Sequence, residues 1–152
     1  SPLEPMPIGN MAWEKVVEQV DGCVKPFNNL LSAITEGKLA KLRSVVVLST
    51  STIGKGGELF THRNIAKGAL ESFLRCAAEI YSEAKISFNG VALGYVDTPQ
   101  LRKYLTDIAS KYGILEKHRP GKIISVTDTA NFCIFVGQYA SRSISGHIFP
   151  FS

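Results

Sequence analysis

The stretch SVVVL, residues 44–48, decides the fold class. Its consecutive valines are β-branched residues, which favour extended backbone and pack well in a sheet. The run is continuously apolar and does not alternate with polar positions, which is typical of a parallel strand buried on both faces. The stretch therefore predicts a buried parallel strand, and such a strand requires helices on both sides of its sheet.

Working outward from this strand, the periodicity of apolar residues changes repeatedly between helical spacing and short continuous runs. Alternating helices and strands predict an α/β fold with right-handed crossovers and a parallel sheet. We expect about three parallel strands and four helices. The predicted elements are a helix over 10–36, a strand over 44–48, a polar glycine-rich loop over 49–58, a helix over 61–84, a strand over 86–93, a helix over 97–111, a helix over 126–140 and a last strand over 146–151.

Local signals predict where the first helix begins, bends and ends. Asn10 is the expected N-cap, because a short polar side chain there can accept a hydrogen bond from the first turn. Gly22 and Pro26 are expected to kink or loosen the middle of the helix. Gly37 is expected to end it, and Gly113 is expected to end the third helix.

Length and composition are those of one globular domain. The chain has 152 residues, 45% of them hydrophobic and 20% charged, which is enough for a core. It contains no run of about 18 apolar residues and no signal-peptide pattern, so we expect a cytoplasmic protein without a membrane partner. The sequence begins at Ser1, which suggests processing or excision from a longer chain. A sheet of three strands is small, so we expect it to be completed by further residues or by another chain.

Charge and cysteine content exclude several classes of function. The net charge is +4, but the 17 basic residues are scattered, so we interpret them as a solvated surface and expect no nucleic-acid partner. The three cysteines, Cys23, Cys76 and Cys133, each fall in an apolar helical pattern. We expect buried thiols in a reducing compartment, with no disulfide frame and no metal site.

A search for nucleotide-binding motifs gives a negative result. The glycine cluster at 54–57 fits neither the dinucleotide fingerprint nor the phosphate loop, because the required later glycine and the Gly-Lys-Ser/Thr ending are missing. We interpret it as a connector. The three histidines, His62, His118 and His147, share no zinc-binding spacing with acids or cysteines.

Four blocks of sequence lie at or beside the predicted strand ends. They are VVVLSTSTIG (45–54), NIAKGALE (64–71), ISFNGVALGYVDTP (86–99) and SISGHIFP (143–150). In order and spacing they resemble the C-terminal half of the short-chain dehydrogenase/reductase family. The resemblance covers the chain from about residue 10 onward. It implies a single partial Rossmann-like domain over 1–152, equivalent to the second half of a doubly wound parallel sheet.

The resemblance also implies a cofactor and an assembly. The family uses NAD(P), but its glycine-rich phosphate loop belongs to the first half, which nothing in this sequence matches. We therefore expect the chain alone not to bind NAD(P) well. In the family the two long helices pair across a two-fold axis, so the helices over 10–36 and 61–84 are expected to form a homodimer or to contact the missing half or a partner domain.

The catalytic residues of the family can be carried over by position. Its serine corresponds to Ser51, or to Thr50 if no gap is placed, and its lysine corresponds to Lys67, which would hydrogen-bond the cofactor ribose. The proton-donating tyrosine belongs four residues before the lysine, where this sequence has Arg63. An arginine stays protonated at any usable pH, so it can stabilise an anion but cannot act as a general acid. The relay asparagine corresponds to Gln19.

Other positions leave alternatives open. The enoyl-reductase branch places its tyrosine seven residues before the lysine, and Phe60 stands there, with no proton to give. His62 titrates in a useful range, and Tyr95 lies in the loop that faces nicotinamide and substrate in the family, so either could replace the missing acid. In the same loop the resemblance makes Gly94 and Thr98 cofactor contacts, although Thr98 could be only a helix cap.

Three hypotheses about function follow from the sequence. The first is a homologue of NAD(P)-dependent oxidoreductases that is degenerate or inactive as an isolated chain. The alternative is a non-catalytic, reductase-like scaffold or dimerisation domain of a larger biosynthetic enzyme or complex. A third hypothesis is an active variant that uses His62 or Tyr95 and works only with the missing half.

Overall fold

Three parallel strands form one sheet in the computed structural model, which describes residues 5–53, 60–106 and 123–152. The strands are β1 (Ser44–Thr50), β2 (Ser87–Leu93) and β3 (Ile148–Phe151), in the spatial order β1-β2-β3. Both pairings are parallel, from Ser44 opposite Ser87 in the first to Leu93 opposite Phe151 in the second. The α/β prediction with a three-stranded parallel sheet is confirmed.

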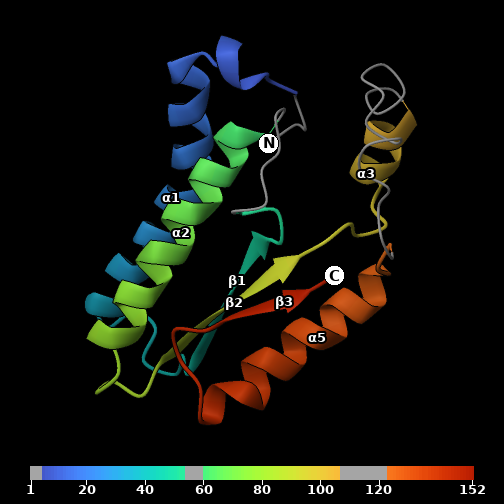
Figure 1. Ribbon diagram of the computed structural model, residues 1–152. Coiled ribbons are helices and arrows are strands. Elements are labelled where there is room, and N and C mark those ends of the chain that lie inside the picture. The colour runs from blue at the N-terminus through green and yellow to red at the C-terminus, as the bar shows by residue number, and fades with distance from the viewer. Residues whose placement is uncertain (1–4, 54–59, 107–122) are drawn as a thin grey trace.

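Helices cover both faces of this sheet. The long helices α1 (Trp13–Thr35) and α2 (Thr61–Ile80) lie side by side on one face, and α5 (Val126–Gln138) lies on the other (Figure 1). The short helix α3 (Pro99–Tyr104) lies beyond the carboxyl end of β2. Two 3₁₀ turns, Ile8–Asn10 and Ala140–Arg142, complete the described elements. The carboxyl end of β1 and the starts of α1 and α2 lie at the same end of the molecule (Figure 1).

The main core lies between α1, α2 and the sheet. Phe88 on β2 and Leu74 on α2 are fully buried there, and the ring of Phe27 on α1 meets the rings of Phe73 and Phe88 edge to face at 5.2 and 6.1 Å. Burying such side chains contributes about 1.5–3 kcal/mol each. The buried cluster consists of Phe27, Leu31, Val45, Leu70, Leu74, Ala77, Ala78, Ile86 and Phe88.

A buried asparagine fixes the entry to the last strand. Asn89 on β2 is fully buried, and its amide donates to the Ile144 carbonyl oxygen at 2.8 Å while its side-chain oxygen accepts from the His147 backbone nitrogen at 3.1 Å. At the next position, a β-carbon on Gly90 would come within 2.5 Å of the Ile148 side chain. A side chain at this position would therefore require the Ile148 Cδ1 methyl to move, whereas glycine fits the present packing of β3 on β2.

The end of α1 is as predicted, and its start is not. Gly37 has φ +73°, its backbone nitrogen donates to Ile34 and the next nitrogen donates to Ala33, which is the Schellman arrangement. The prediction of Asn10 as N-cap is wrong, because this residue lies in a 3₁₀ turn and the N-cap is Ala12, which offers no side-chain hydrogen bond. The helix runs without a break through Pro26.

Other predicted boundaries shift by a few residues. β1 extends to Thr50, so the loop predicted from residue 49 begins later, and α2 ends at Ile80 and not at residue 84. The reason at the first site is that Ser49 and Thr50 pair in register with Ala92 and Leu93, although they are polar. The glycine cluster at 54–57 and the residues around Gly113 lie outside the described residues, as do the other residues of 107–122.

The cysteine prediction was partly wrong. All three thiols are free, but Cys76 is exposed and Cys23 and Cys133 are only partly buried. Apolar neighbours in sequence therefore do not ensure that a cysteine on a helix is buried. Within the described residues, no helix is both long and apolar enough to span a membrane.

Candidate functional site

A cavity of about 520 Å³ lies between α1, α2, the outer edge of β1 and the start of α3. It brings together three residues carried over from the sequence resemblance: Gln19 from α1 and Arg63 and Lys67 from α2. A volume of this size is typical of small-molecule sites. The other lining residues are Gly22, Cys23, Pro26, Phe27, Leu30, Val45, Val46, Val47, Leu48, Leu70 and Gln100.

Helical spacing explains why these side chains converge. Residues three or four apart lie on one face of a helix, so Arg63 and Lys67 project from the same face of α2. Gln19 and Cys23 are also four apart and share a face of α1. Since α1 and α2 pack side by side on one face of the sheet, these two pairs meet across the cavity.

Lys67 is anchored at the open edge of the sheet. Its Nζ donates to the backbone oxygen of Leu48 at 2.8 Å, and Leu48 belongs to β1, the outer strand. Burial lowers the pKa of Lys67; the charge of the Cys23 thiolate opposes this shift, and the positive charge of Arg63 adds to it. One of the three ammonium protons is therefore engaged by the protein, and two remain for a ligand.

Arg63 is a partly buried cation that lacks a matching anion. Burial lowers its pKa, and the Cys23 thiolate offsets part of that shift. Across the described ranges, its guanidinium makes no hydrogen bond and no ion pair. No aspartate or glutamate is among the described residues that line the cavity. The arrangement can stabilise negative charge, and Arg63 stays protonated at any usable pH, so it cannot act as a general acid.

Ser51 and Thr50 lie outside this lining. The backbone nitrogen of Ser51 donates to the Leu93 oxygen at 2.9 Å, which ties it to the end of β2. The hydroxyl of Thr50 is 2.9 Å from that of Thr52, which donates to the Asn64 side chain at 2.8 Å. The hydroxyl groups after β1 therefore connect the strand end to the start of α2, and the structure does not bring Ser51 into the cavity with the two cations.

The two residues predicted as cofactor contacts have structural roles in this fold. Gly94 donates its backbone N–H to Phe151 at 2.9 Å, and a β-carbon there would come within 2.9 Å of the Ser152 side chain. Thr98 is the N-cap of α3, and its Oγ1 accepts from the Leu101 backbone nitrogen at 3.2 Å. The alternative interpretation of Thr98 as a helix cap is confirmed.

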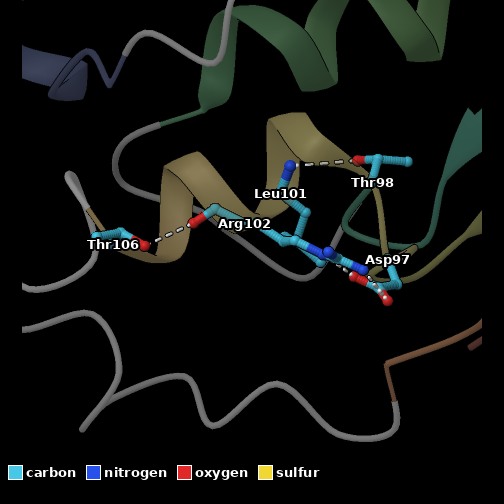
Figure 2. A network of polar contacts seen from close by, with 5 residues as sticks. All are labelled: Asp97, Thr98, Leu101, Arg102 and Thr106. Carbon is cyan, nitrogen blue, oxygen red and sulfur yellow. Dashed lines mark hydrogen bonds and ion pairs between the residues drawn. The ribbon is translucent and has the colours of Figure 1, made fainter.

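Around this cap, Figure 2 shows that α3 is held by a bidentate ion pair. The guanidinium of Arg102 donates to both carboxylate oxygens of Asp97, at 2.7 and 2.8 Å. This hydrogen bonding lowers the pKa of Asp97. One turn on, the hydroxyl of Thr106 donates to the Arg102 carbonyl at 3.0 Å. The polar groups after β2 thus cap and stabilise the short helix α3.

The alternative proton donors are placed away from the cavity lining. His62 is only 3% exposed and lies 6.5 Å, ring to ring, from Phe60, which in turn contacts the Tyr104 ring at 5.5 Å. Burial raises the pKa of Tyr104, and the nearby Tyr95 adds to the shift. None of these four residues is part of the cavity lining.

Sequence reasoning missed Cys23 and Gln100, which also line the cavity. Cys23 could have been found, because it lies one helical turn after Gln19 on the predicted first helix. No sequence pattern predicts Gln100 as a lining residue, because its position in the cavity depends on where α3 lies relative to β2. In the described part of the chain, no cluster of three or more histidine, cysteine, aspartate or glutamate residues has the arrangement of a metal site.

Comparison with known proteins supports the fold over the whole chain. A short-chain dehydrogenase family protein from Francisella tularensis superposes with a TM-score of 0.82 at 18% identity, covering 99% of this chain and 66% of that one. An NADPH-bound short-chain oxidoreductase from Pseudomonas aeruginosa, described as containing an atypical catalytic center, superposes with a TM-score of 0.81 at 13% identity, covering 100% and 61%. The 3-ketoacyl-(acyl-carrier-protein) reductase of Brucella melitensis, complexed with NADH, gives 0.73 at 18% identity, covering 98% and 61%.

The chain therefore spans less than two thirds of the length of each of these structures. No curated protein sequence matches it. At the level of family models, the one described as enoyl-(acyl carrier protein) reductase matches residues 3–151. With a Rossmann-like fold shared over its whole length and a family model matched almost end to end, this chain belongs to the short-chain dehydrogenase/reductase family.

Proposed function

We propose that this chain is a reductase homologue that has lost the tyrosine-dependent proton transfer of its family. The observation that carries the proposal is the content of the cavity: Arg63 and Lys67 lie together, and no tyrosine, histidine or carboxylic acid lines it among the described residues. Reduction of a ketone needs a proton for the developing alkoxide, and a positioned general acid supplies it. Arg63 supplies positive charge instead.

Cys23 is the described lining residue that carries a thiol, whose S–H is a weak donor. Gln19 and Gln100 have no titratable proton. Cys23 is therefore the candidate substitute for the missing acid, and the turnover experiment includes a Cys23→Ala variant.

The cofactor proposal is limited to one contact. NADPH or NADH is present in the Pseudomonas and Brucella structures, and Lys67 has ammonium protons that suit a ribose hydroxyl. When bound, a nicotinamide cofactor would supply the hydride. Gly94 and Thr98 already serve packing and capping, so we propose that this chain alone holds NAD(P) weakly.

Turnover measurements test the proposal. The chain, and any longer natural chain that contains it, is incubated with NADPH and a panel of ketones and enoyl thioesters while NADPH absorbance is followed. We expect no substrate-dependent loss of absorbance. Turnover abolished by Lys67→Ala would overturn the proposal, and turnover abolished by Cys23→Ala would identify the thiol as the acid.

A gain-of-function pair separates the two branches of the family. If the longer protein binds cofactor without turning over, Arg63→Tyr is expected to restore ketone reduction, whereas Phe60→Tyr places the phenol at the enoyl-reductase position. A rise in turnover with one variant and not the other identifies the ancestral chemistry. Failure of both, with NADPH binding intact, argues against a degenerate enzyme and for the scaffold.

The second candidate function, a non-catalytic scaffold, is favoured by apolar side chains on the outer surface of the long helices. Trp13 and Val17 on α1 are 66% and 44% exposed, and Ile65 and Ile80 on α2 are 40% and 72% exposed. Apolar surface of this kind marks contact sites more often than isolated exposed residues do. We propose a homodimer through α1 and α2, or contact with a partner domain. Free thiols are compatible with the reducing cytoplasm, where we place the protein.

A further inference from the structure

We propose that the cavity between α1 and α2 binds the phosphate or carboxylate group of a small molecule through Arg63 and Lys67. This inference builds on the proposed function, because it assigns a role to the arginine that replaces the proton donor. It concerns binding alone and requires neither cofactor nor turnover.

The lining of the cavity carries an excess of positive charge. Two cations line the cavity one helical turn apart, and the described lining residues include no carboxylate to neutralise them. Like charges four residues apart on a helix repel each other. Arg63 indeed contributes to lowering the pKa of Lys67, and burial opposes the charged form of both side chains. A bound anion would relieve the repulsion and compensate both partly buried charges at once.

Both cations have N–H donors that are not engaged within the described residues. A guanidinium has five N–H donors in a planar fork that fits a carboxylate or phosphate with two parallel bonds. Arg63 uses none of them within the part of the chain that the structure describes. Lys67 spends one donor on the Leu48 oxygen, which holds its ammonium at the cavity wall and leaves two donors. Arg63 therefore offers a planar fork of N–H donors, and Lys67 offers a positive charge that is held in place.

The other residues that line the cavity combine carboxamide groups with apolar side chains. Gln19 and Gln100 bring carboxamide groups from α1 and from the start of α3, while Phe27, Leu30 and Leu70 supply an apolar floor. About 520 Å³ is more than an inorganic anion occupies, since a water molecule takes about 30 Å³. The site thus has room for an anionic head group joined to an apolar body.

Calorimetric titration of the 152-residue chain with inorganic phosphate and, separately, with succinate tests this proposal. We expect saturable binding at low salt to at least one probe, and the stronger probe distinguishes a phosphorylated from a carboxylated ligand. Arg63→Gln is expected to weaken binding about tenfold or more, because the bidentate contact is lost. Absence of saturable binding to both probes overturns the proposal.

Arg75→Gln is the matched control. Arg75 lies on the same helix, is 54% exposed, pairs with Glu71 at 3.6 Å and is not part of the cavity lining, so its loss changes net charge equally without touching the site. Binding to this variant is expected to stay within about twofold of wild type. If it weakens as much as Arg63→Gln, the anion is attracted by overall charge and the site is wrong.

A second measurement needs no variant. Backbone amide resonances of the wild-type chain are followed during titration with phosphate. Shifts that gather around Gln19, Arg63 and Lys67 support the site, and shifts that gather elsewhere contradict it. Since no NADPH or ketone is present, failure here leaves the proposed loss of reduction standing, and turnover in the earlier assay leaves anion binding standing.

Discussion

At the scale of single residues, Arg63 bears most on what the cavity can do. Arg63 and Lys67 lie four residues apart on α2 and both line the cavity, and under the proposed function Arg63 stands where the family has its proton donor. Lys67 responds to this change, since its pKa is lowered by burial, against the thiolate of Cys23 and with the help of Arg63. The side chain is therefore best interpreted as part of an electrostatic pair.

The first prediction concerns Lys67 and pH. Because its pKa in the folded chain lies below the ordinary value of 10.5, the unfolded chain binds more protons between those two values. The free energy of unfolding of wild type, minus that of Lys67→Met, is thus expected to rise as pH increases toward 10.5. Urea denaturation of both proteins across alkaline pH measures it. A difference that stays flat or falls would show that Lys67 is not desolvated in the folded state.

A second prediction concerns the core. Leu74 is fully buried among the residues between α2 and the sheet, so Leu74→Ala removes apolar contacts and leaves a cavity. We expect the free energy of unfolding to fall by about 3 kcal/mol. Ile134→Ala on α5 is the control, because Ile134 is 52% exposed and lies outside the proposed α1–α2 contact, and we expect a change within about 0.5 kcal/mol. Equal losses would mean that α2 is packed differently.

The residues of the candidate site were only partly accessible to sequence reasoning. Arg63 and Lys67 could be placed because their spacing on a helix survives in the sequence, and Gln19 because it lies on the preceding helix. Ser51 was not placed in the cavity, since β1 continues to Thr50 and the Ser51 backbone bonds to β2. Side chains after a strand depend on where pairing stops, which tertiary contacts decide.

At the scale of elements, type was easier to predict than boundaries. The continuous valine run and the helical stripes identified every strand and long helix, because burial enforces their periodicities. The ends of helices depend on local hydrogen bonds. Gly37 marks the end of α1 because glycine readily adopts the positive φ of the Schellman turn. Asn10 could have capped the start, but it lies in a 3₁₀ turn before the helix. Polar residues can still pair in a sheet, as Ser49 does. The hydroxyl of Ser49 donates to the carboxylate of buried Glu71 at 2.5 Å, so its burial is compensated.

A pair of glycines tests this account of α1 and α2. Gly37 has φ +73°, so Gly37→Ala forces an alanine into the left-handed region and is expected to cost about 1 kcal/mol of unfolding free energy. Gly68 lies inside α2, where a β-carbon would meet nothing within 4 Å, so Gly68→Ala is expected to stabilise by about 0.5–1 kcal/mol. Thermal denaturation compares them. Opposite signs are expected, and two losses of equal size would contradict the helix boundary.

At the scale of the whole molecule, the sheet is small and its first strand is at an edge. β1 pairs only with β2 among the described strands, and Lys67 occupies one of its outward carbonyl groups at Leu48. This chain covers only 66% and 61% of two of the matched structures, and the expectation that further residues complete the sheet at this edge stays a prediction. That expectation rests on the number of strands alone, and the sequence could not indicate which side chains occupy the edge.

The outer surface of α1 and α2 leads to a prediction about assembly. The homodimer that we propose through α1 and α2 is expected to become monomeric when Val17→Asp is combined with Ile65→Asp, because two charges would then have to be buried in the proposed contact. Ile134→Asp on α5 is the control, since that side chain is 52% exposed on the helix that covers the opposite face of the sheet. Sedimentation velocity measures the mass of each. A wild-type monomer at all concentrations, or a control that dissociates equally, rules out this interface.

The most direct test of the central claim, that position 63 has lost proton donation, is NADPH oxidation by the chain and by any longer protein that contains it. The measurement compares wild type, Lys67→Ala and Arg63→Tyr with the same panel of ketones. We expect wild type and Lys67→Ala to be equally inactive and Arg63→Tyr to gain turnover once cofactor binds. Ketone-dependent oxidation by wild type that disappears in Lys67→Ala would contradict the claim.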